Sequence, residues 1–335
     1  MDIDKNPLEL PPTAGQLRRL AKSGVLSVEA LERGLKIINH TPDREKWERF
    51  LSIVLLILGA GFTISGIYFF FAFNWASMHR FFKLGLLEVA MLVSIGLAIW
   101  LSLDKLSGKI ALAASGLLVG ALIAVYGQVY QTGADSYQLF LTWALLVSGW
   151  VMISKFTPLW FLWILLFNLA LSFYWPQIIG DINSVLYLSL LLLNGGAILI
   201  WEIAHARGIE WLKSRWAPRL LSLPTFVGLV IPTITLIFSS TRERSNDPWL
   251  YLMPVIYLII SLIVLYMYSQ KILDLFMLTI CAFSLIVTFN IWVFDLLESL
   301  DELLLCILSG LFIGQAALVV TWLRKVSKSW EARNS

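Results

Sequence analysis

The chain contains 335 residues, of which 59% are hydrophobic and 14% are charged. Charged residues make up about 25% of an ordinary soluble domain, so the composition excludes that class. The formal net charge is only +3. This charge is of the kind that orients membrane proteins, and no basic stripe suggests nucleic acid, so we expect no nucleic-acid partner.

Long apolar stretches indicate membrane-spanning helices. A helix that crosses a hydrocarbon core about 30 Å thick needs roughly 20 mainly apolar residues. Ten stretches meet this requirement: 51–73, 84–103, 110–127, 137–155, 157–174, 184–203, 220–239, 249–268, 272–293 and 303–323. Continuous apolar runs such as residues 186–201 exclude a barrel, whose strands would alternate over about 10 residues. We therefore predict an all-α, polytopic membrane protein with about ten transmembrane helices in the lipid bilayer.

The distribution of lysine and arginine predicts the orientation of these helices. Cytoplasmic loops of membrane proteins carry an excess of both residues near the helix ends. If the N-terminus is inside, 21 of the 25 basic residues fall in inner segments. The outer loops then hold only Arg80, Lys83, Arg242 and Arg244. We expect a multi-pass protein of the cell's inner membrane with both termini in the cytoplasm.

Residues 1–41 are predicted to form a cytoplasmic segment with two short helices, separated at Ser23 and Gly24. Ser27 is a suitable N-cap for the second helix, whose apolar side chains recur at helical spacing: Val28, Leu31, Leu35 and Ile38. A DNA-binding helix-turn-helix is one interpretation. However, the first 50 residues carry nine basic and eight acidic groups, whereas DNA binding needs an excess of positive charge. We expect this segment to dock on the cytoplasmic ends of the spans or on a protein partner.

Residues 42–203 are expected to hold the first six spans. Thr41 and Pro42 are a suitable cap and first-turn pair for the first of these helices. In the third span, Gly116 and Gly120 have the small-xxx-small spacing that permits close packing against a neighbouring helix.

Residues 204–219 separate the sixth span from the seventh. They are predicted to form an interfacial helix on the inner leaflet, with Ile209, Leu212 and Trp216 on the apolar face and basic groups opposite.

Residues 220–323 are expected to hold spans seven to ten, and residues 324–335 form a basic cytoplasmic tail. Glu202 and Asp274 should lie near the inner face and reach water. Amides within the spans are expected to form hydrogen bonds between helices: Asn168, Asn194, Asn290 and Gln315. The two cysteines, Cys281 and Cys306, are expected to be small buried side chains.

Three segments carry a family resemblance. They read GVLSVEALERGLKII (residues 24–38), FAFNW (71–75) and YGQVYQTGADSYQLFLTWALL (126–146). Together they resemble the bacterial "domain of unknown function 2157" family of predicted membrane proteins, over roughly residues 15–175. The resemblance implies an inner-membrane multi-pass protein and implies no activity.

Polar side chains gather on the predicted outer side of spans one to four, around a polar elbow at residues 127–137. They form a candidate ligand-binding site: Asn74, Glu88, Gln128, Gln131, Asp135 and Tyr137. Carboxylates within a span are rare and often functional, which draws attention to Glu88. Gln128 and Gln131 would share a helix face if the third helix continued that far. The same cluster could instead lock the helices to one another, and both interpretations stay open.

Three classes of function remain. The first is an accessory, assembly or sensing protein of the membrane, which fits the lack of charged residues at mid-membrane. The second is a transporter of a small solute with an outward-facing polar site, although an inverted repeat is missing. The third is an intramembrane enzyme, which ranks last because the sequence has no cluster suited to catalysis. The histidines lie in different loops, so we expect no metal site and no cofactor.

Overall fold

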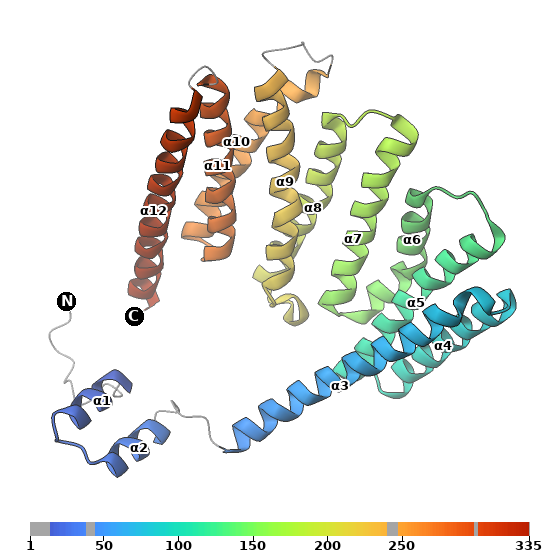
Figure 1. Cartoon of the computed structure of the whole chain (residues 1–335), viewed down its shortest axis with the longest axis horizontal. Coiled ribbons are helices and arrows are strands. Elements are labelled where there is room, and N and C mark those ends of the chain that lie inside the picture. Colours follow the sequence, from blue (N-terminus) through green and yellow to red (C-terminus); the bar gives the residue numbers. More distant parts are fainter. Residues whose placement is uncertain (1–13, 38–43, 240–246, 298–300, 335) are drawn as a thin grey trace. The chain divides into compact units, whose positions relative to one another are not determined.

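All regular secondary structure in the described residues is helical (Figure 1). The structure, a computed structural model, describes residues 14–37, 44–239, 247–297 and 301–334. The helices are α1 (Ala14–Lys22), α2 (Val28–Ile37), α3 (Arg44–Asn74), α4 (Arg80–Trp100), α5 (Leu106–Tyr130), α6 (Ser136–Ser154), α7 (Thr157–Tyr174), α8 (Ser184–Ala206), α9 (Trp216–Ser239), α10 (Met253–Gln270), α11 (Leu275–Leu296) and α12 (Asp301–Asn334). Short turns of other helical types are η1 (Trp75–Ser77), η2 (Trp175–Ile179), η3 (Glu210–Leu212) and η4 (Pro248–Tyr251).

Eight stretches of the described residues are long and apolar enough to cross a membrane. They comprise α4, α5, α6, α7 with η2, α8, α9, η4 with α10, and α11. The protein is therefore a polytopic helical membrane protein, as its composition predicted. Helices α3 and α12 coincide with the first and tenth predicted spans, and their passage through the membrane stays a prediction.

The chain divides into two compact units, Met1–His79 and Arg80–Ser335. In the first unit, α1 and α2 are the two predicted short helices, separated at Gly24, which has a φ of +76°. The Ser27 hydroxyl accepts a hydrogen bond from the Ala30 amide at 3.2 Å and so caps α2, as predicted.

The apolar stripe predicted on α2 is covered only in part. Leu17 and Leu35 are each 9% exposed, and Leu17 lies against Gly34, so the two helices pack through this contact. Val28, which the stripe included, is 76% exposed. Ile38 and the Thr41-Pro42 pair lie outside the described residues.

In the second unit, each helix from α4 to α8 packs against the next, and α9 contacts both α10 and α11 (Figure 1). Helix α12 packs against α11. Because consecutive helices run antiparallel, their C-terminal ends alternate between the two ends of the unit (Figure 1). Helices α5, α7, α9 and α11 finish at one end, and α4, α6, α8 and α10 finish at the other.

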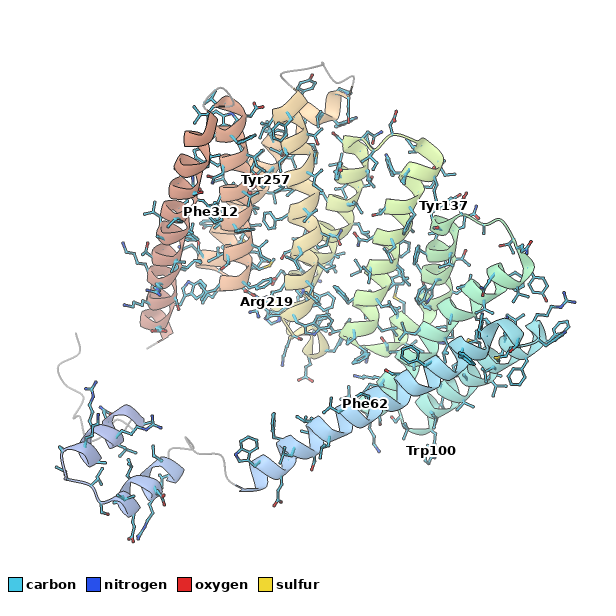
Figure 2. The ribbon with its side chains drawn as sticks, in the orientation of Figure 1. Phe62, Trp100, Tyr137, Arg219, Tyr257 and Phe312 are labelled. Atoms are coloured by element: carbon cyan, nitrogen blue, oxygen red, sulfur yellow. The ribbon has the colours of Figure 1, made fainter. Side chains whose placement is uncertain are left out.

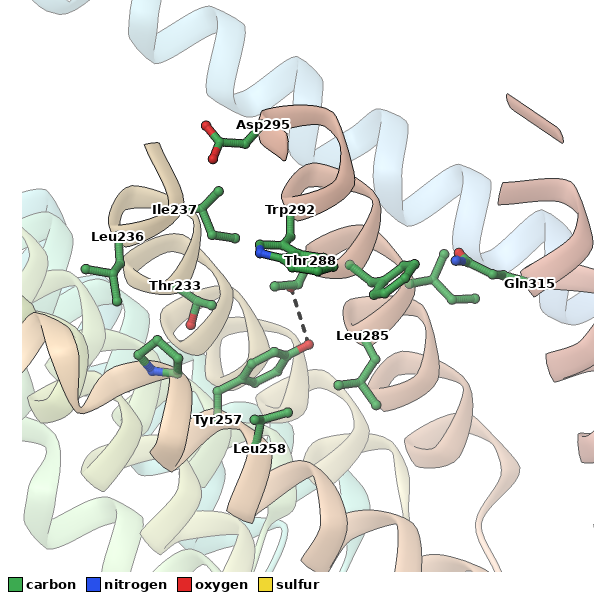
Figure 3. A pocket seen from close by; sticks show the side chains of 13 residues that line it. Thr233, Leu236, Ile237, Tyr257, Leu258, Leu285, Thr288, Trp292, Asp295 and Gln315 are labelled. Atoms are coloured by element: carbon green, nitrogen blue, oxygen red, sulfur yellow. Dashed lines mark hydrogen bonds between the residues drawn. The ribbon is translucent and has the colours of Figure 1, made fainter. Parts of the chain in front are cut away.

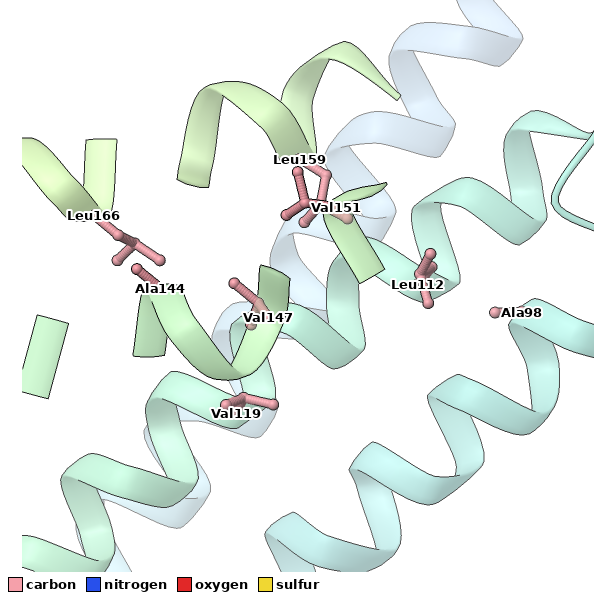
Figure 4. Close-up of a cluster of buried hydrophobic side chains, with 8 residues drawn as sticks. All are labelled: Ala98, Leu112, Val119, Ala144, Val147, Val151, Leu159 and Leu166. Atoms are coloured by element: carbon pink, nitrogen blue, oxygen red, sulfur yellow. The ribbon is translucent and has the colours of Figure 1, made fainter. Parts of the chain in front are cut away.

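The core of α4–α7 is a cluster of buried aliphatic side chains (Figure 4). Its members are Ala98, Leu112, Val119, Ala144, Val147, Val151, Leu159 and Leu166. Trp143 of α6 lies against Gly120 of α5, where a Cβ would approach its ring more closely than real Cβ atoms do. The Trp143 indole N–H donates to the carbonyl oxygen of Gly116 at 2.7 Å. The two glycines therefore permit close packing, as their spacing predicted.

Pairs of amides join neighbouring helices, which confirms the role predicted for them. Asn168 of α7 and Asn194 of α8 exchange two hydrogen bonds, at 3.0 Å and 2.6 Å. The Asn290 amide N–H of α11 donates to the Gln315 Oε1 of α12 at 2.6 Å. Cys281 is fully buried and free, as expected, while the side chain of Cys306 lies outside the described residues.

An ion cluster ties α8, α9 and α10 to the start of α11. Arg215 pairs with Glu202 at 2.6 Å and with Asp274 at 3.5 Å, and Arg219 pairs with Asp274 at 3.0 Å. The Tyr268 hydroxyl donates to Glu202 at 2.9 Å. The expectation that both carboxylates reach water is wrong for Asp274, which is only 4% exposed. The two arginines compensate its charge, which a buried carboxylate requires.

The predicted interfacial helix at residues 204–219 is absent as a continuous helix. The segment holds the end of α8, the short turn η3 and the start of α9, and Leu212 of η3 is buried. The Trp201 indole N–H donates to the Leu212 carbonyl oxygen at 3.2 Å. Packing against the spans therefore outweighs the helical periodicity that suggested a surface helix.

The basic segment at residues 324–335, predicted as a tail, continues α12 as far as Asn334. The Trp330 indole N–H donates to the Ser269 carbonyl oxygen at 2.8 Å, which fixes this part of the helix against α10.

Candidate functional site

The polar elbow is a short loop between α5 and α6. Helix α5 ends at Tyr130, and Gln131 follows in the left-handed conformation with a φ of +46°. Gly133 also has a positive φ, +64°, which a glycine adopts without strain. Asp135 occupies the N-cap position of α6, but its side chain makes no capping hydrogen bond. The Asp135 carboxylate therefore lies beside the start of α6 but does not cap the helix.

A cavity of about 950 Å³ lies between α4, α5, α6 and this loop. We name it the elbow pocket. Its polar lining comprises Glu88, Tyr126, Tyr130, Thr132, Asp135, Ser136, Gln138 and Thr142. Apolar side chains such as Phe81, Leu122 and Ile123 complete the walls. Among the described residues, the lining contains two carboxylates and no basic side chain, so this part of the pocket has a negative charge.

The two carboxylates are exposed to the pocket and unpaired within the described part of the chain. Glu88 lies two turns into α4 and is exposed, as is Asp135. Neither forms an ion pair or a side-chain hydrogen bond with another described residue. The Arg80 guanidinium instead lies over the Phe81 ring, 5.2 Å from its centroid.

Tyr126 and Tyr130 form an aromatic wall of the pocket. They are four residues apart on α5, so they share one face of the helix. Their ring centroids are 4.7 Å apart. Aromatic faces attract cations within about 6 Å of the ring centroid. A cation in the pocket would thus meet both ionic and aromatic partners.

Of the predicted site residues, the structure brings only some to the elbow pocket. Glu88 and Asp135 line the elbow pocket together. Gln128 and Gln131 are exposed and do not line it. Because α5 ends before Gln131, the two glutamines do not share a helix face. Tyr137 sits at the start of α6 (Figure 2).

Tyr137 faces α7 rather than the pocket. Its ring lies edge-on to that of Tyr174, with centroids 5.2 Å apart, and its backbone N–H donates to Gln177 at 3.3 Å. Asn74 belongs to the other unit and its side chain is not among those described. The six-residue site as a whole therefore stays a prediction.

Sequence reasoning missed several lining residues: Tyr126, Thr132, Ser136, Gln138 and Thr142. The four-residue spacing of Tyr126 and Tyr130, and of Gln138 and Thr142, could have identified a shared polar face on each helix. Within the described ranges, no group of three or more His, Cys, Asp or Glu side chains could hold a metal ion.

The fold and the elbow pocket define a multi-pass helical membrane protein with an acidic cavity at one end of its helices. Residues 18–160 match the family described as predicted membrane protein (DUF2157). The resemblance drawn from the three sequence segments is thereby confirmed for this part of the chain. The match includes the whole elbow pocket and ends just inside α7. No curated protein and no solved structure matches the chain.

Proposed function

We propose that this protein is a non-enzymatic sensing or accessory component of the inner membrane that binds a small cationic solute in the elbow pocket. The observation that carries the proposal is that Glu88 and Asp135 line one cavity, whose described lining has no basic side chain. An amine or guanidinium group would offset part of this negative charge, and a diamine carries enough charge to compensate both carboxylates. The orientation predicted from the basic residues, with both termini cytoplasmic, would open this pocket to the outside.

The alternative role of these carboxylates, a lock between helices, has less support. A lock requires hydrogen bonds or ion pairs from one helix to the next. Within the described part of the chain, Glu88 and Asp135 make none. Both groups are therefore free to bind a solute.

A sensor also needs a cytoplasmic output, and the N-terminal helices offer a surface for one. Val25, Val28 and Ile37 are 71%, 76% and 83% exposed. We propose that a protein partner covers these apolar side chains. The charge balance of the first 50 residues argues against a nucleic acid in this role.

Transport is the alternative function, and it would need a path to the opposite end of the helices. The lining of the elbow pocket reaches Leu122 on α5 and Thr142 on α6. Leu122 lies eight residues before Tyr130, which corresponds to a depth of about 12 Å. A pocket of this depth suits binding from one side.

The test measures binding of simple amines to the full-length protein in lipid nanodiscs. The probes are 1,4-diaminobutane and butylamine, with 1,4-butanediol as the neutral analogue and succinate as the anionic one. We expect binding of the amines alone. Saturating amine should stabilise the protein by about 2.7 kcal/mol at a concentration 100 times its Kd.

Charge-removing variants of the same shape identify the site. Glu88→Gln and Asp135→Asn should each weaken amine binding by about tenfold or more, because each removes one charged partner. Asp181→Asn changes an exposed carboxylate in a loop at the same end, outside the pocket lining, and should bind normally. Equal binding of the diol would refute a cation site. If the two pocket variants lower the stability of the unliganded protein, the carboxylates act as a lock.

A further inference from the structure

A second cavity, of about 800 Å³, lies among α9, α10, α11 and α12. It is remote in sequence from the elbow pocket and lies outside the family match. Its lining is mainly apolar and includes Leu236, Leu258, Leu285 and Phe289. Of the described residues in this lining, Asp295 alone is charged. We name this cavity the α9–α12 cavity.

The face of α11 that lines the α9–α12 cavity is continuous. Its members recur at helical spacing: Leu285, Thr288, Phe289, Trp292 and Asp295. Ten residues separate the first from the last, which corresponds to about 15 Å along the helix. Leu258, Phe289 and Trp292 are 54%, 46% and 48% exposed. The cavity is therefore long and reachable from outside the protein.

Polar groups deep in the cavity are already paired. The Tyr257 hydroxyl donates to the Ser284 hydroxyl at 2.9 Å, and the Thr288 hydroxyl lies 3.5 Å from Tyr257 (Figure 3). Thr288 also donates to the Ser284 carbonyl oxygen at 2.9 Å. Because these groups satisfy one another, an apolar ligand can lie against them without leaving a buried hydrogen-bonding group unpaired.

One end of the cavity has a negative charge. Figure 3 shows Asp295 at one end, Tyr257 and Leu258 toward the other, and Trp292 between them. Asp295 lies in the last turn of α11, where the helix dipole is also negative. A carboxylate there is unfavourable unless a cation compensates it. Within the described residues, Asp295 has no ion-pair partner.

Trp292 supplies the second element of a cation site. It precedes Asp295 by three residues and so lies on the same helix face. Of the aromatic side chains, tryptophan attracts cations most strongly. The lining thus combines an apolar trough with a carboxylate and an indole at one end.

We propose that the α9–α12 cavity binds an amphiphilic cation, with its apolar part between α9, α10 and α11 and its ammonium group at Asp295 and Trp292. A volume of about 800 Å³ falls within the range of roughly 300–1,000 Å³ that is typical of pockets for drug-sized ligands. This size favours a compact single-chain amphiphile over a two-chain lipid. The proposal is independent of the elbow pocket, which is polar and lies on other helices.

The experiment measures saturable binding of radiolabelled dodecyltrimethylammonium to the full-length protein in phosphatidylcholine nanodiscs. Empty nanodiscs provide the background from partition into lipid. Asp295→Asn keeps the shape and removes the charge, so we expect it to weaken binding by about tenfold or more. Leu258→Trp should fill the cavity from its exposed edge and weaken binding as well.

Two controls locate the effect. Uncharged dodecanol should bind the wild-type protein and the Asp295→Asn variant equally. Asp181→Asn, which lies outside the linings of both cavities, should bind dodecyltrimethylammonium normally. Equal affinity of the wild-type protein and Asp295→Asn for the cation would overturn the proposal, and so would loss of binding in Asp181→Asn. The measurement is repeated in nanodiscs that contain phosphatidylethanolamine. If this lipid abolishes binding of dodecyltrimethylammonium, the occupant is a membrane lipid, and the choice of a single-chain ligand is overturned.

Discussion

Gly120 offers the sharpest test of how α5 and α6 pack. In the structure, a Cβ at this position would lie closer than 3.0 Å to the Trp143 ring. The ring cannot easily move away, because its indole N–H is bonded to the Gly116 carbonyl oxygen at 2.7 Å. Gly120→Ala must therefore displace a rigid side chain and strain that hydrogen bond.

The expected magnitude follows from these contacts. Overpacking of a core typically costs about 1–3 kcal/mol, and weakening the indole hydrogen bond adds about 0.5–1.5 kcal/mol. The better helix propensity of alanine returns up to about 1 kcal/mol. Taking the middle of these ranges, we expect a net loss of about 2 kcal/mol in the free energy of unfolding.

Two other glycines provide matched controls. At Gly116, an added Cβ would lie 3.3 Å from a methyl group of Leu159, which can shift, so Gly116→Ala should cost less. At Gly149 of α6, nothing lies within 4 Å, so Gly149→Ala should be neutral or stabilising. The three substitutions make the same chemical change and differ in what the new methyl group meets.

The assay is unfolding of the purified protein by SDS in mixed micelles, followed by near-UV circular dichroism. A double-mutant cycle with Trp143→Leu isolates the proposed clash. In the Trp143→Leu background, Gly120→Ala should lose most of its effect, which corresponds to a coupling energy of about 2 kcal/mol. An equal effect of Gly120→Ala in both backgrounds would refute the reasoning, as would stability like that of Gly149→Ala.

Three further predictions concern the amide pair, the ion cluster and the orientation. Asn194→Leu should destabilise the protein by about 1 kcal/mol, because it leaves the Asn168 amide unpaired. Adding Asn168→Leu should recover part of this loss, and a larger loss in the double variant in the SDS assay would contradict the prediction. Asp274→Asn removes one of the two carboxylates that balance Arg215 and Arg219, and it should cost about 3 kcal/mol in the same assay. Arg219→Gln should cost less than about 1 kcal/mol, because the Arg219 side chain is 42% exposed. A larger loss in Arg219→Gln than in Asp274→Asn would contradict this argument from burial. A periplasm-active reporter should be active when fused after Ala134, Asp181 or Asp247, and inactive after Leu106, Arg215 or Arg333; activity at Arg333 would exclude an even number of spans.

The sequence by itself determined the class of protein and the approximate position of most helices. In a chain with so little charge, an apolar run of about 20 residues indicates a membrane-spanning helix. The eight apolar helices were therefore predictable from the length and hydropathy of their segments. The spacing of Gly116 and Gly120 likewise indicated a close contact. It did not identify Trp143 as the partner, because the approach of two helices depends on both of their surfaces.

Only the tertiary structure decided which polar residues meet. Glu88 and Asp135 lie 47 positions apart in the sequence, and the packing of α4 against α5 and of α5 against α6 brings them to one pocket. The sequence grouped Gln128 and Gln131 with them, but the left-handed turn at Gln131 ends the helix first. Glu202, Arg215 and Asp274 form one ion cluster because three helix ends converge there. Hydropathy depends on each residue alone and therefore predicts spans, whereas an ion pair or a pocket depends on the rotation of each helix about its axis, which packing against neighbouring helices sets.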